Sequence, residues 1–381
     1  MRRHKLPTET FLESAQRQLN ICNACRYCEG YCAVFPALEL RSTFTEADVT
    51  YLANLCHDCR ACLDACMYAP PHEFGVDIPA TLRTARDAGY VRYAWPHRLA
   101  TLLWHHPRAS VAVATLGGFV AALVAESANG RSLVAGRSGP GSFYTVIPWL
   151  GMVLAFGLAA LFIIAVVSGA IVTFWRSGTV RPRKASWGAA WRGVIADVVP
   201  LRYLGGGGPG CPYPDPDRPS HGRRLLHQAV LYGFLLDFAS TCVAAIYQDI
   251  LHRMPPYPVT SLPVLLGIIG GVGVIAGCTG LLHLRYAAWR LRHERPAPQD
   301  VSFVAVLNLV AITGMILLIL RATPAMPILL DLHLASVFAL FLTLPYSRFV
   351  HAAYRVAALL RNRLEEAAQP QLGAEDEGVA A

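Results

Sequence analysis

The stretch CNACRYCEGYC, residues 22–32, carries four cysteines with the spacing C-x2-C-x2-C-x3-C. The stretch CHDCRACLDAC, residues 56–66, repeats that spacing. Together they contain eight of the eleven cysteines in a chain of 381 residues. Three closely spaced thiolates followed by a fourth are the pattern that holds a cubane [4Fe–4S] cluster. The repeat therefore predicts two such clusters near the start of the chain.

In a pair of such runs, the fourth cysteine of each run ligates the cluster of the other. We therefore assign Cys22, Cys25, Cys28 and Cys66 to cluster 1, and Cys56, Cys59, Cys62 and Cys32 to cluster 2. Zinc is the alternative, because four thiolates complete a tetrahedral zinc site. Zinc gives no reason for repeating the third and fourth cysteines, and the pattern favours two cubanes.

The spacer between the runs reads as a helix. In FTEADVTYLANLC, residues 44–56, Thr45 is the expected N-cap and Asp48 occupies the third helical position. Ala33 and Met67 follow the fourth cysteines, where bacterial ferredoxins place proline. We expect an all-α protein whose residues 1–100 form an α-helical ferredoxin domain. Such domains occur in the iron–sulfur subunits of succinate dehydrogenase and heterodisulfide reductase.

The rest of the chain is strongly apolar. Hydrophobic residues make up 54% of the sequence and charged residues 15%, against about 25% charge in a typical globular protein. Six segments approach the ~20 residues that cross a bilayer: 109–126, 148–174, 225–247, 262–285, 301–321 and 328–346. The first is short and ends at Glu126, so five spans is the alternative. We expect residues 101–360 to form a six-helix membrane domain like that of a cytochrome b, and 361–381 a disordered tail.

The charges between the spans predict the topology. Arginine and lysine gather in 175–224, in 285–300 and after the sixth span, whereas 127–147 and 248–261 carry few. The positive-inside rule places the basic segments, the cysteine domain and the C-terminus on the cytoplasmic side of a bacterial inner membrane. The basic start has no apolar signal segment behind it. The net charge of +8 belongs to these loops, so nucleic acid is not an expected partner.

Histidines at the spans are candidate haem ligands. His227, near the cytoplasmic end of the third span, and His351, just past that of the sixth, are the expected axial pair of one haem b. His333 lies eighteen residues before His351, or about 27 Å and five turns of one helix. A second haem would then pair His333 with His252, and His283 is a rival inner ligand. The alternative is that each histidine only caps or hydrogen-bonds a neighbouring helix.

Other features carry weaker predictions. Asp237, in the third span, marks either a proton path or a buried hydrogen bond. Residues 205–220 read as a Gly/Pro connector without the context of a phosphate loop. Four glycines predict close packing of the fourth span: Gly267, Gly271, Gly273 and Gly277. An apolar stripe predicts a helix on the membrane surface, with a plain loop helix as the alternative: Trp187, Trp191, Ile195 and Val198.

Two family resemblances extend these readings. The histidines of spans three and six are similar to those of the cytochrome b subunits of respiratory nitrate reductase, except that Asp237 stands where that family has a second histidine. The whole chain resembles the tricarballylate-utilisation protein B family, also called CitB, and the corresponding half of the cobalamin-synthesis protein CobZ. The stretches that carry this resemblance are CNACRYCEGYCAVFPALE, CHDCRACLDACMYAPPHEFGVDIPATL, GGGGPGCPYPDPDRPS, RRLLHQAVLYGFLLDFAST and LPYSRFVHAAYR.

The second resemblance implies an oxidoreductase component with two [4Fe–4S] clusters and haem b. It also implies a soluble FAD-dependent dehydrogenase as partner, which oxidises tricarballylate, and membrane quinone as the electron acceptor. His72 is then a candidate contact for the flavoprotein, or a solvent-facing loop histidine. The alternatives are a self-contained reductase of the heterodisulfide type, and a transporter with a regulatory iron–sulfur head.

Overall fold

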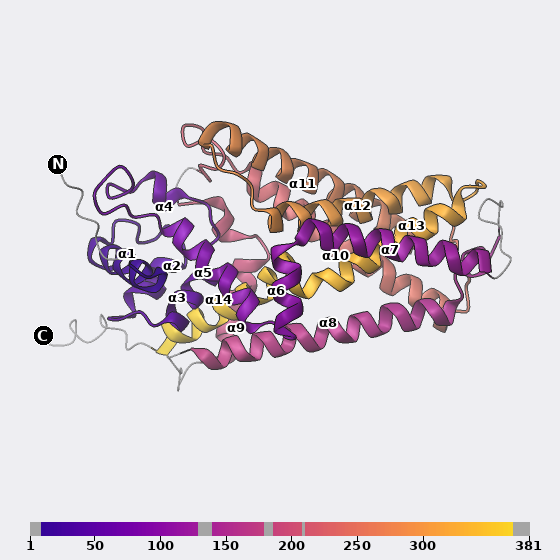
Figure 1. Ribbon diagram of the computed structural model, residues 1–381, viewed down its shortest axis with the longest axis horizontal. Helices are drawn as coiled ribbons and strands as arrows, with labels where there is room; N and C mark the ends of the chain where they lie inside the picture. The colour runs from indigo at the N-terminus through magenta and orange to yellow at the C-terminus, as the bar shows by residue number, and fades with distance from the viewer. Residues whose placement is uncertain (1–8, 129–138, 179–185, 208–209, 369–381) are drawn as a thin grey trace, which may run out of the picture. The chain divides into compact units, whose positions relative to one another are not determined.

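The computed structural model describes residues 9–128, 139–178, 186–207 and 210–368 (Figure 1). The described residues form helices and one isolated antiparallel bridge, between Cys211 and Ser220, and the all-α expectation is confirmed for them. The chain divides into two compact units. The cluster unit comprises the described residues of Met1–Tyr93, Ile171–Ser220 and His351–Ala381, and the membrane unit those of Ala94–Ala170 and His221–Val350. The sequence led us to expect two continuous domains instead.

The cluster unit is built on short capped helices. Thr10 begins α1 and Thr45 begins α3, each with a capping box whose partners are Glu13 and Asp48. The prediction for Thr45 and Asp48 is thus confirmed. The helices are α1 (Phe11–Cys25), α2 (Val34–Glu39), α3 (Glu46–Leu55), α4 (Ala61–Asp64), α5 (Ile78–Tyr93), α9 (Trp187–Val198), the 3-10 turn η2 (Arg202–Gly205) and α14 (His351–Ala368).

Helix α14 is held in the cluster unit by a buried ion network. Arg41 donates from Nη2 to Glu365 of α14 at 2.9 Å and from Nε to Asp48 of α3 at 2.9 Å. Leu364 beside this network is also buried. These contacts explain why α14 runs to Ala368, whereas we expected a tail from residue 361. The rest of the expected tail, 369–381, lies outside the described residues.

Helix α9 exposes three of the four residues of the stripe expected from its sequence, and the fourth, Val198, is half-buried. Trp187, Trp191 and Ile195 are exposed, whereas Asp197, on the opposite face, is buried and pairs with Arg363 of α14. Ser186 caps the helix through a bond from the Ala189 amide. The exposed stripe has the geometry of a surface helix, and its contact with lipid stays a prediction.

Six helices are long and apolar enough to cross a membrane, and all belong to the membrane unit except the last residues of α8, from Ile171 on. They are α7 (Pro107–Ala128), α8 (Trp149–Ser177), α10 with the π-turn η3 (Gly222–Ile250), α11 (Leu262–Arg292), α12 (Pro298–Leu320) and α13 with η4 (Met326–Tyr346). Helix α6 (His97–His105) precedes α7, and the short η1 (Ser142–Thr145) precedes α8. Each of the six expected spans coincides with one of these helices, and α7, which covers the weakest of them, has 22 residues.

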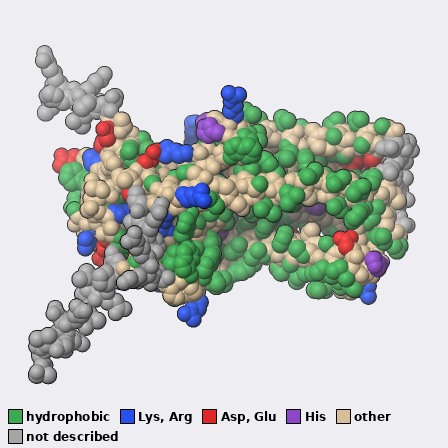
Figure 2. Space-filling model, turned by 90° about the horizontal axis from the view of Figure 1, so that it is seen from below, with side chains coloured by type: hydrophobic (Ala, Val, Ile, Leu, Met, Phe, Trp, Pro, Cys, Tyr) green, Lys and Arg blue, Asp and Glu red, His purple; other side chains and the backbone are tan. Residues whose placement is uncertain are grey.

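Apolar side chains cover much of the surface of these helices (Figure 2). In the most apolar windows of α7 and α8, only 11% of the residues are buried, against 50% in α13. Exposed apolar area on this scale is rare in water-soluble monomers. It fits helices whose outer faces meet lipid.

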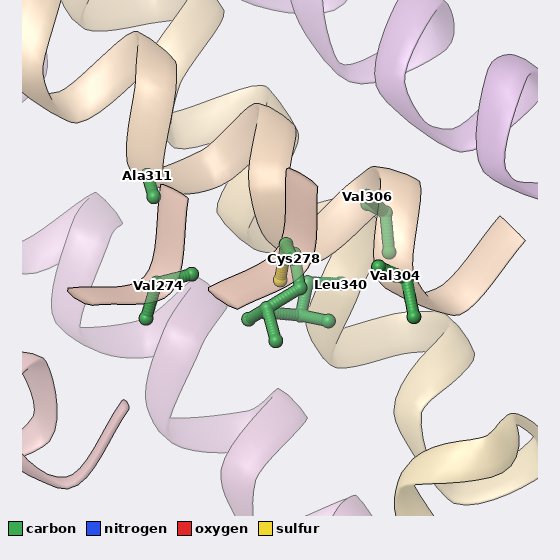
Figure 3. Packing of buried hydrophobic residues seen from close by; sticks show 7 residues of the cluster. Val274, Cys278, Val304, Val306, Ala311 and Leu340 are labelled. Atoms are coloured by element: carbon green, nitrogen blue, oxygen red, sulfur yellow. The ribbon is translucent and has the colours of Figure 1, made fainter. Parts of the chain in front are cut away.

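The inner faces pack tightly. A buried cluster joins α11, α12 and α13 through Val274, Cys278, Val306 and Leu340 (Figure 3). Helices α10 and α11 approach through glycines, as predicted. A methyl group on Gly277 would lie 2.7 Å from the Leu226 carbonyl oxygen, and one on Gly233 would lie 2.8 Å from that of Gly270. Only hydrogen in place of a side chain permits this separation.

The chain breaks its helix between His333 and His351, and our treatment of them as one continuous helix was wrong. Helix α13 ends at Thr343, the 3-10 turns η4 (Leu344–Tyr346) and η5 (Arg348–Val350) follow, and α14 begins at His351. Pro345 lacks the amide that a helix needs, and Ser347 is extended at φ −114° and ψ −179°. The shared face and the separation of about 27 Å no longer follow.

Candidate metal centre

The two cysteine runs share one backbone device. Arg26 follows Cys25, and Arg60 follows Cys59, at the same position of each run. The backbone of both arginines adopts the left-handed conformation, with φ of 53° at Arg26 and 67° at Arg60. This conformation costs a non-glycine residue about 1–2 kcal/mol, so its repetition marks a required turn. The turn reverses the chain between the second and third cysteines of each run.

The first group of thiols combines residues from both runs. Cys22, Cys25, Cys28 and Cys66 line one cavity, together with Cys62. Burial, and next the Cys66 thiol, raise the pKa of Cys22 to about 12. Burial and then Cys66 also raise the pKa of Cys28, to about 11. The strongest neighbouring charge at both first-run cysteines therefore comes from the end of the second run, as a crossed ligand set requires.

The second group shows the same exchange in reverse. Burial raises the pKa of Cys32, and Cys56 and Cys59 of the other run add to it. Burial likewise raises the pKa of Cys62, followed by Cys56 and Cys32. The Asp58 amide donates to Cys56 Sγ at 3.4 Å, the type of bond that stabilises a cluster thiolate.

These thiols fit cubane clusters. Among the described residues, no group of three or more His, Cys, Asp or Glu side chains is arranged to hold one ion. A cubane cluster needs a different arrangement from a single ion, because each of its four irons binds one thiolate and the four thiolates surround the cluster. The raised pKa values mean that these thiols need positive charge to ionise at neutral pH. Iron supplies that charge, and its binding releases protons.

Three distant segments surround the second run. Arg86 of α5 donates to the Cys56 carbonyl oxygen at 2.7 Å, and Arg355 of α14 donates to the same oxygen at 2.7 Å. Cys211 is fully buried, and its thiol lies 3.6 Å from the Cys59 carbonyl oxygen. Sequence reasoning connected neither arginine with the cysteines and took Cys211 to stand alone. The position of Cys211 within a Gly/Pro stretch was the one sequence feature that could have pointed to its contact with the cysteine run.

The Gly/Pro stretch is therefore more than a connector. Cys211 packs with Cys59, and Tyr31 and Tyr213 pack against that pair. A methyl group on Gly207 would lie 2.6 Å from the Tyr31 ring, so the backbone must come this close. The described part of the stretch thus packs against Cys59 of the second run and Tyr31 of the first.

The surroundings of the first run are open by comparison. Cys25 is exposed, and Tyr27 and Met67 beside it are 58% and 60% exposed. His72 lies in an aromatic group next to them, with ring centres 5.3 Å from Tyr68 and 4.9 Å from Phe74. Its Nδ1 accepts the Phe74 amide at 3.1 Å. His72 thus shapes an exposed loop, and its role as a flavoprotein contact stays a prediction.

The histidines of the spans divide between the units. His227 lies in α10 and His283 in α11 of the membrane unit, while His252 follows η3 with a φ of 53°. His351 is the first residue of α14 in the cluster unit. His333 of α13 has its Nδ1 3.1 Å from the Thr313 hydroxyl of α12. That bond orients the ring, as an axial ligand requires, and it equally links two helices.

Asp237 packs against the neighbouring helix. Its Oδ1 occupies the space in which a side chain on Gly270 of α11 would lie. The glycine thus makes room for a carboxylate in the middle of the membrane unit.

Comparison with known proteins places this arrangement in a family. The family model for the citrate utilization protein B Fer4-like domain matches residues 15–94, and the model for citrate utilization protein B matches 103–371. A curated Escherichia coli protein called citrate utilization protein B is 40% identical over 372 residues, 97% of this chain and 96% of the relative. This chain belongs to the citrate utilization protein B family. No solved structure matches it.

The family assignment confirms the resemblance drawn from the sequence. The Fer4-like domain coincides with the part of the cluster unit that holds all eight cysteines. The second match covers all six apolar helices and continues into α14. A citrate utilization protein B thus joins an iron–sulfur type of domain to helices suited to a membrane.

Proposed function

We propose that this protein is a membrane-bound electron relay. It accepts electrons from the reduced FAD of a soluble dehydrogenase and passes them through two [4Fe–4S] clusters and haem b to the quinone pool. The observation that carries this proposal is the crossed grouping of the eight cysteines in a chain with six apolar helices. Such clusters are one-electron carriers.

The partner is a dehydrogenase for a tricarboxylic acid. The family resemblance points to tricarballylate, and the Escherichia coli relative is named for citrate utilization. Oxidation of either class of substrate by FAD leaves two electrons on the flavin. The quinone takes up two electrons and two protons. The relay therefore runs twice for each turnover of the dehydrogenase.

The exposed side of the first run is the place where a soluble donor can approach. Cys25, Tyr27 and Met67 are all exposed. The positive-inside rule supports a position of this unit and of the C-terminus on the cytoplasmic side of a bacterial inner membrane. The ring centres of Trp187 and Trp175 lie 6.1 Å apart, and Trp175 is near the end of the apolar helix α8. The exposed stripe of α9 would then lie on the lipid headgroups.

His351 and His227 are the residues that would hold haem b. His351 lies one helical turn before Arg355 on α14, and Arg355 reaches the carbonyl oxygen of Cys56. Residues four apart share a helix face. The helix that begins with His351 therefore also contacts the cysteine run assigned to cluster 2. Haem would supply a one-electron carrier between the clusters and quinone.

The test is a cofactor analysis of the anaerobically purified full chain. We expect about eight non-haem irons and eight sulfides, with a b-type haem in the reduced-minus-oxidised spectrum. Added quinone should then reoxidise the reduced protein. Irons without haem would leave a membrane-anchored ferredoxin, and zinc in place of iron would overturn the proposal.

Two variants test the ligands. His351→Ala should remove the haem spectrum and leave iron and sulfide unchanged, and His283→Ala, at the rival ligand, should leave both intact. Cys66→Ser should damage the cluster held by Cys22, Cys25 and Cys28 if the ligands cross between the runs. Loss of the other cluster alone would show that each run builds its own cube. Substrate reduction without any flavoprotein would favour a self-contained reductase.

A further inference from the structure

The two cysteine groups differ in the charges that surround them. Arg86 is 8% exposed and donates to the carbonyl oxygens of Cys56, at 2.7 Å, and Ala53, at 3.2 Å. Arg355 is half-buried and donates to those of Cys56, at 2.7 Å, and Asn54, at 3.3 Å. Two guanidinium groups therefore converge on one carbonyl oxygen at the first cysteine of the second run.

Two exposed arginines donate to carbonyl oxygens near the first run. Arg26 occupies its turn and donates to the Asn23 carbonyl oxygen at 3.2 Å, but its side chain is 57% exposed. Arg17 donates to the Phe74 carbonyl oxygen at 2.8 Å, and its side chain is 44% exposed. Water screens both charges.

The opposing charge near the second run is itself neutralised. The Asp58 carboxylate lies 2.7 Å from Arg83 and 3.8 Å from Arg60. Arg86 and Arg355 therefore bring two fixed positive charges to the Cys56 loop.

A positive field favours the reduced state of a cluster. Reduction adds one negative charge, and burial alone makes that addition harder because it removes solvating water. A buried guanidinium offsets this cost, since its charge acts at low dielectric and is fixed by hydrogen bonds. Charge and hydrogen bonding are thus the means by which the protein sets the order in which two identical clusters are reduced.

Resting on the proposed cubane clusters, we propose that Arg86 and Arg355 make cluster 2 the preferred resting place of the electron. Cluster 1 would lie at the open side, where Cys25 is exposed, and would accept the electron from the soluble donor first. Transfer to cluster 2 would reoxidise cluster 1 and leave the electron beside α14, the helix that begins with His351. Both arginines are positioning residues that act through the Cys56 loop.

The experiment is a redox titration of the full chain, followed by electron paramagnetic resonance. Cys25→Ser, which alters one ligand of cluster 1, assigns the two signals. We expect cluster 2 to be reduced first in the wild-type protein. Arg86→Gln and Arg355→Gln should each shift the electron partition towards cluster 1 by about tenfold. The matched control, Arg17→Gln, removes an exposed arginine that also donates to a carbonyl and should shift nothing.

Two further measurements distinguish the loss of the arginine's charge from a loss of the folded cluster site. Arg86→Lys keeps the charge and should restore most of the partition. The iron and sulfide content of each variant must equal that of the wild type. If Arg86→Gln loses cluster 2, the electron partition measured in Arg355→Gln tests the proposal instead. The inference is overturned if cluster 1 is reduced first, or if both glutamine variants leave the partition unchanged. Absence of eight irons would instead refute the proposed function, so the two failures are distinct.

Discussion

The cluster unit and the membrane unit are both helical, but they join their helices by different means. In the cluster unit, Arg41 binds Asp48 and Glu365, so that buried charges link α14 to α3. In the membrane unit, α10 and α11 meet through Gly233 and Gly277, without side chains between their backbones. The helix starts also differ: α1 and α3 have capping boxes, whereas α11, α12 and α13 have proline in the first turn and no side-chain cap bond.

The difference follows from the surroundings of each unit. In water, the hydrophobic effect drives apolar side chains together, and a few buried ion pairs then fix which helices meet. In lipid, apolar side chains gain nothing by leaving the solvent, so helices associate by close van der Waals contact of small residues. Each contact should therefore fail by a different kind of substitution.

The largest effect is expected in the ion network. Arg41→Gln leaves Asp48 and Glu365 as buried carboxylates without their cation, and should lower the unfolding free energy of the cluster unit by about 3–5 kcal/mol. Arg17→Gln, which removes an exposed pair with Glu9, should cost less than about 1 kcal/mol. Pulse proteolysis of the detergent-solubilised chain in urea measures both. Equal losses in the two variants would contradict the role of the network.

A smaller effect is expected at the glycine contact. Gly277→Ala places a methyl group 2.7 Å from the Leu226 carbonyl oxygen and should destabilise the α10–α11 contact by about 1–3 kcal/mol. Gly117 of α7 has no atom within 4 Å of such a methyl group. Gly117→Ala should therefore be neutral, and thermal unfolding in detergent compares the two. If Gly277→Ala proved neutral, α10 and α11 could move apart without loss of stability, and the close contact would not be required.

The smallest effect is expected at a helix start. Thr10→Ala removes the cap of α1 and should cost about 1 kcal/mol, while Thr10→Ser should keep it. The backbone and side chain of Thr10 lower the pKa of Glu13. The stabilisation from Glu13 is therefore present above its unfolded pKa and is lost as the pH falls through the folded one. Hydrogen exchange of the first turn at neutral and acid pH should show this dependence in the wild type and a weaker one in Thr10→Ala, which keeps the backbone N–H bonded to Glu13.

Local patterns in the sequence determined the parts of the protein that depend on spacing alone. The spacing of the eight cysteines predicted two mixed groups, because three ligands of each cluster lie within a few residues of one another and the fourth comes from the other run. The six spans followed from the length of apolar runs, since a bilayer sets that length. The cap of α3 followed from Thr45 and Asp48, which lie three residues apart.

Tertiary structure alone decided which distant segments meet. Arg41 and Glu365 are 324 residues apart, and Arg355 reaches the second cysteine run from 299 residues further along the chain. Cys211 meets Cys59 across 152 residues. No periodicity encodes such pairs, because they depend on how whole helices pack. The break at Pro345 separated His333 from His351 for the same reason: the apolar pattern continues through the turn, and only the backbone shows that the helix does not.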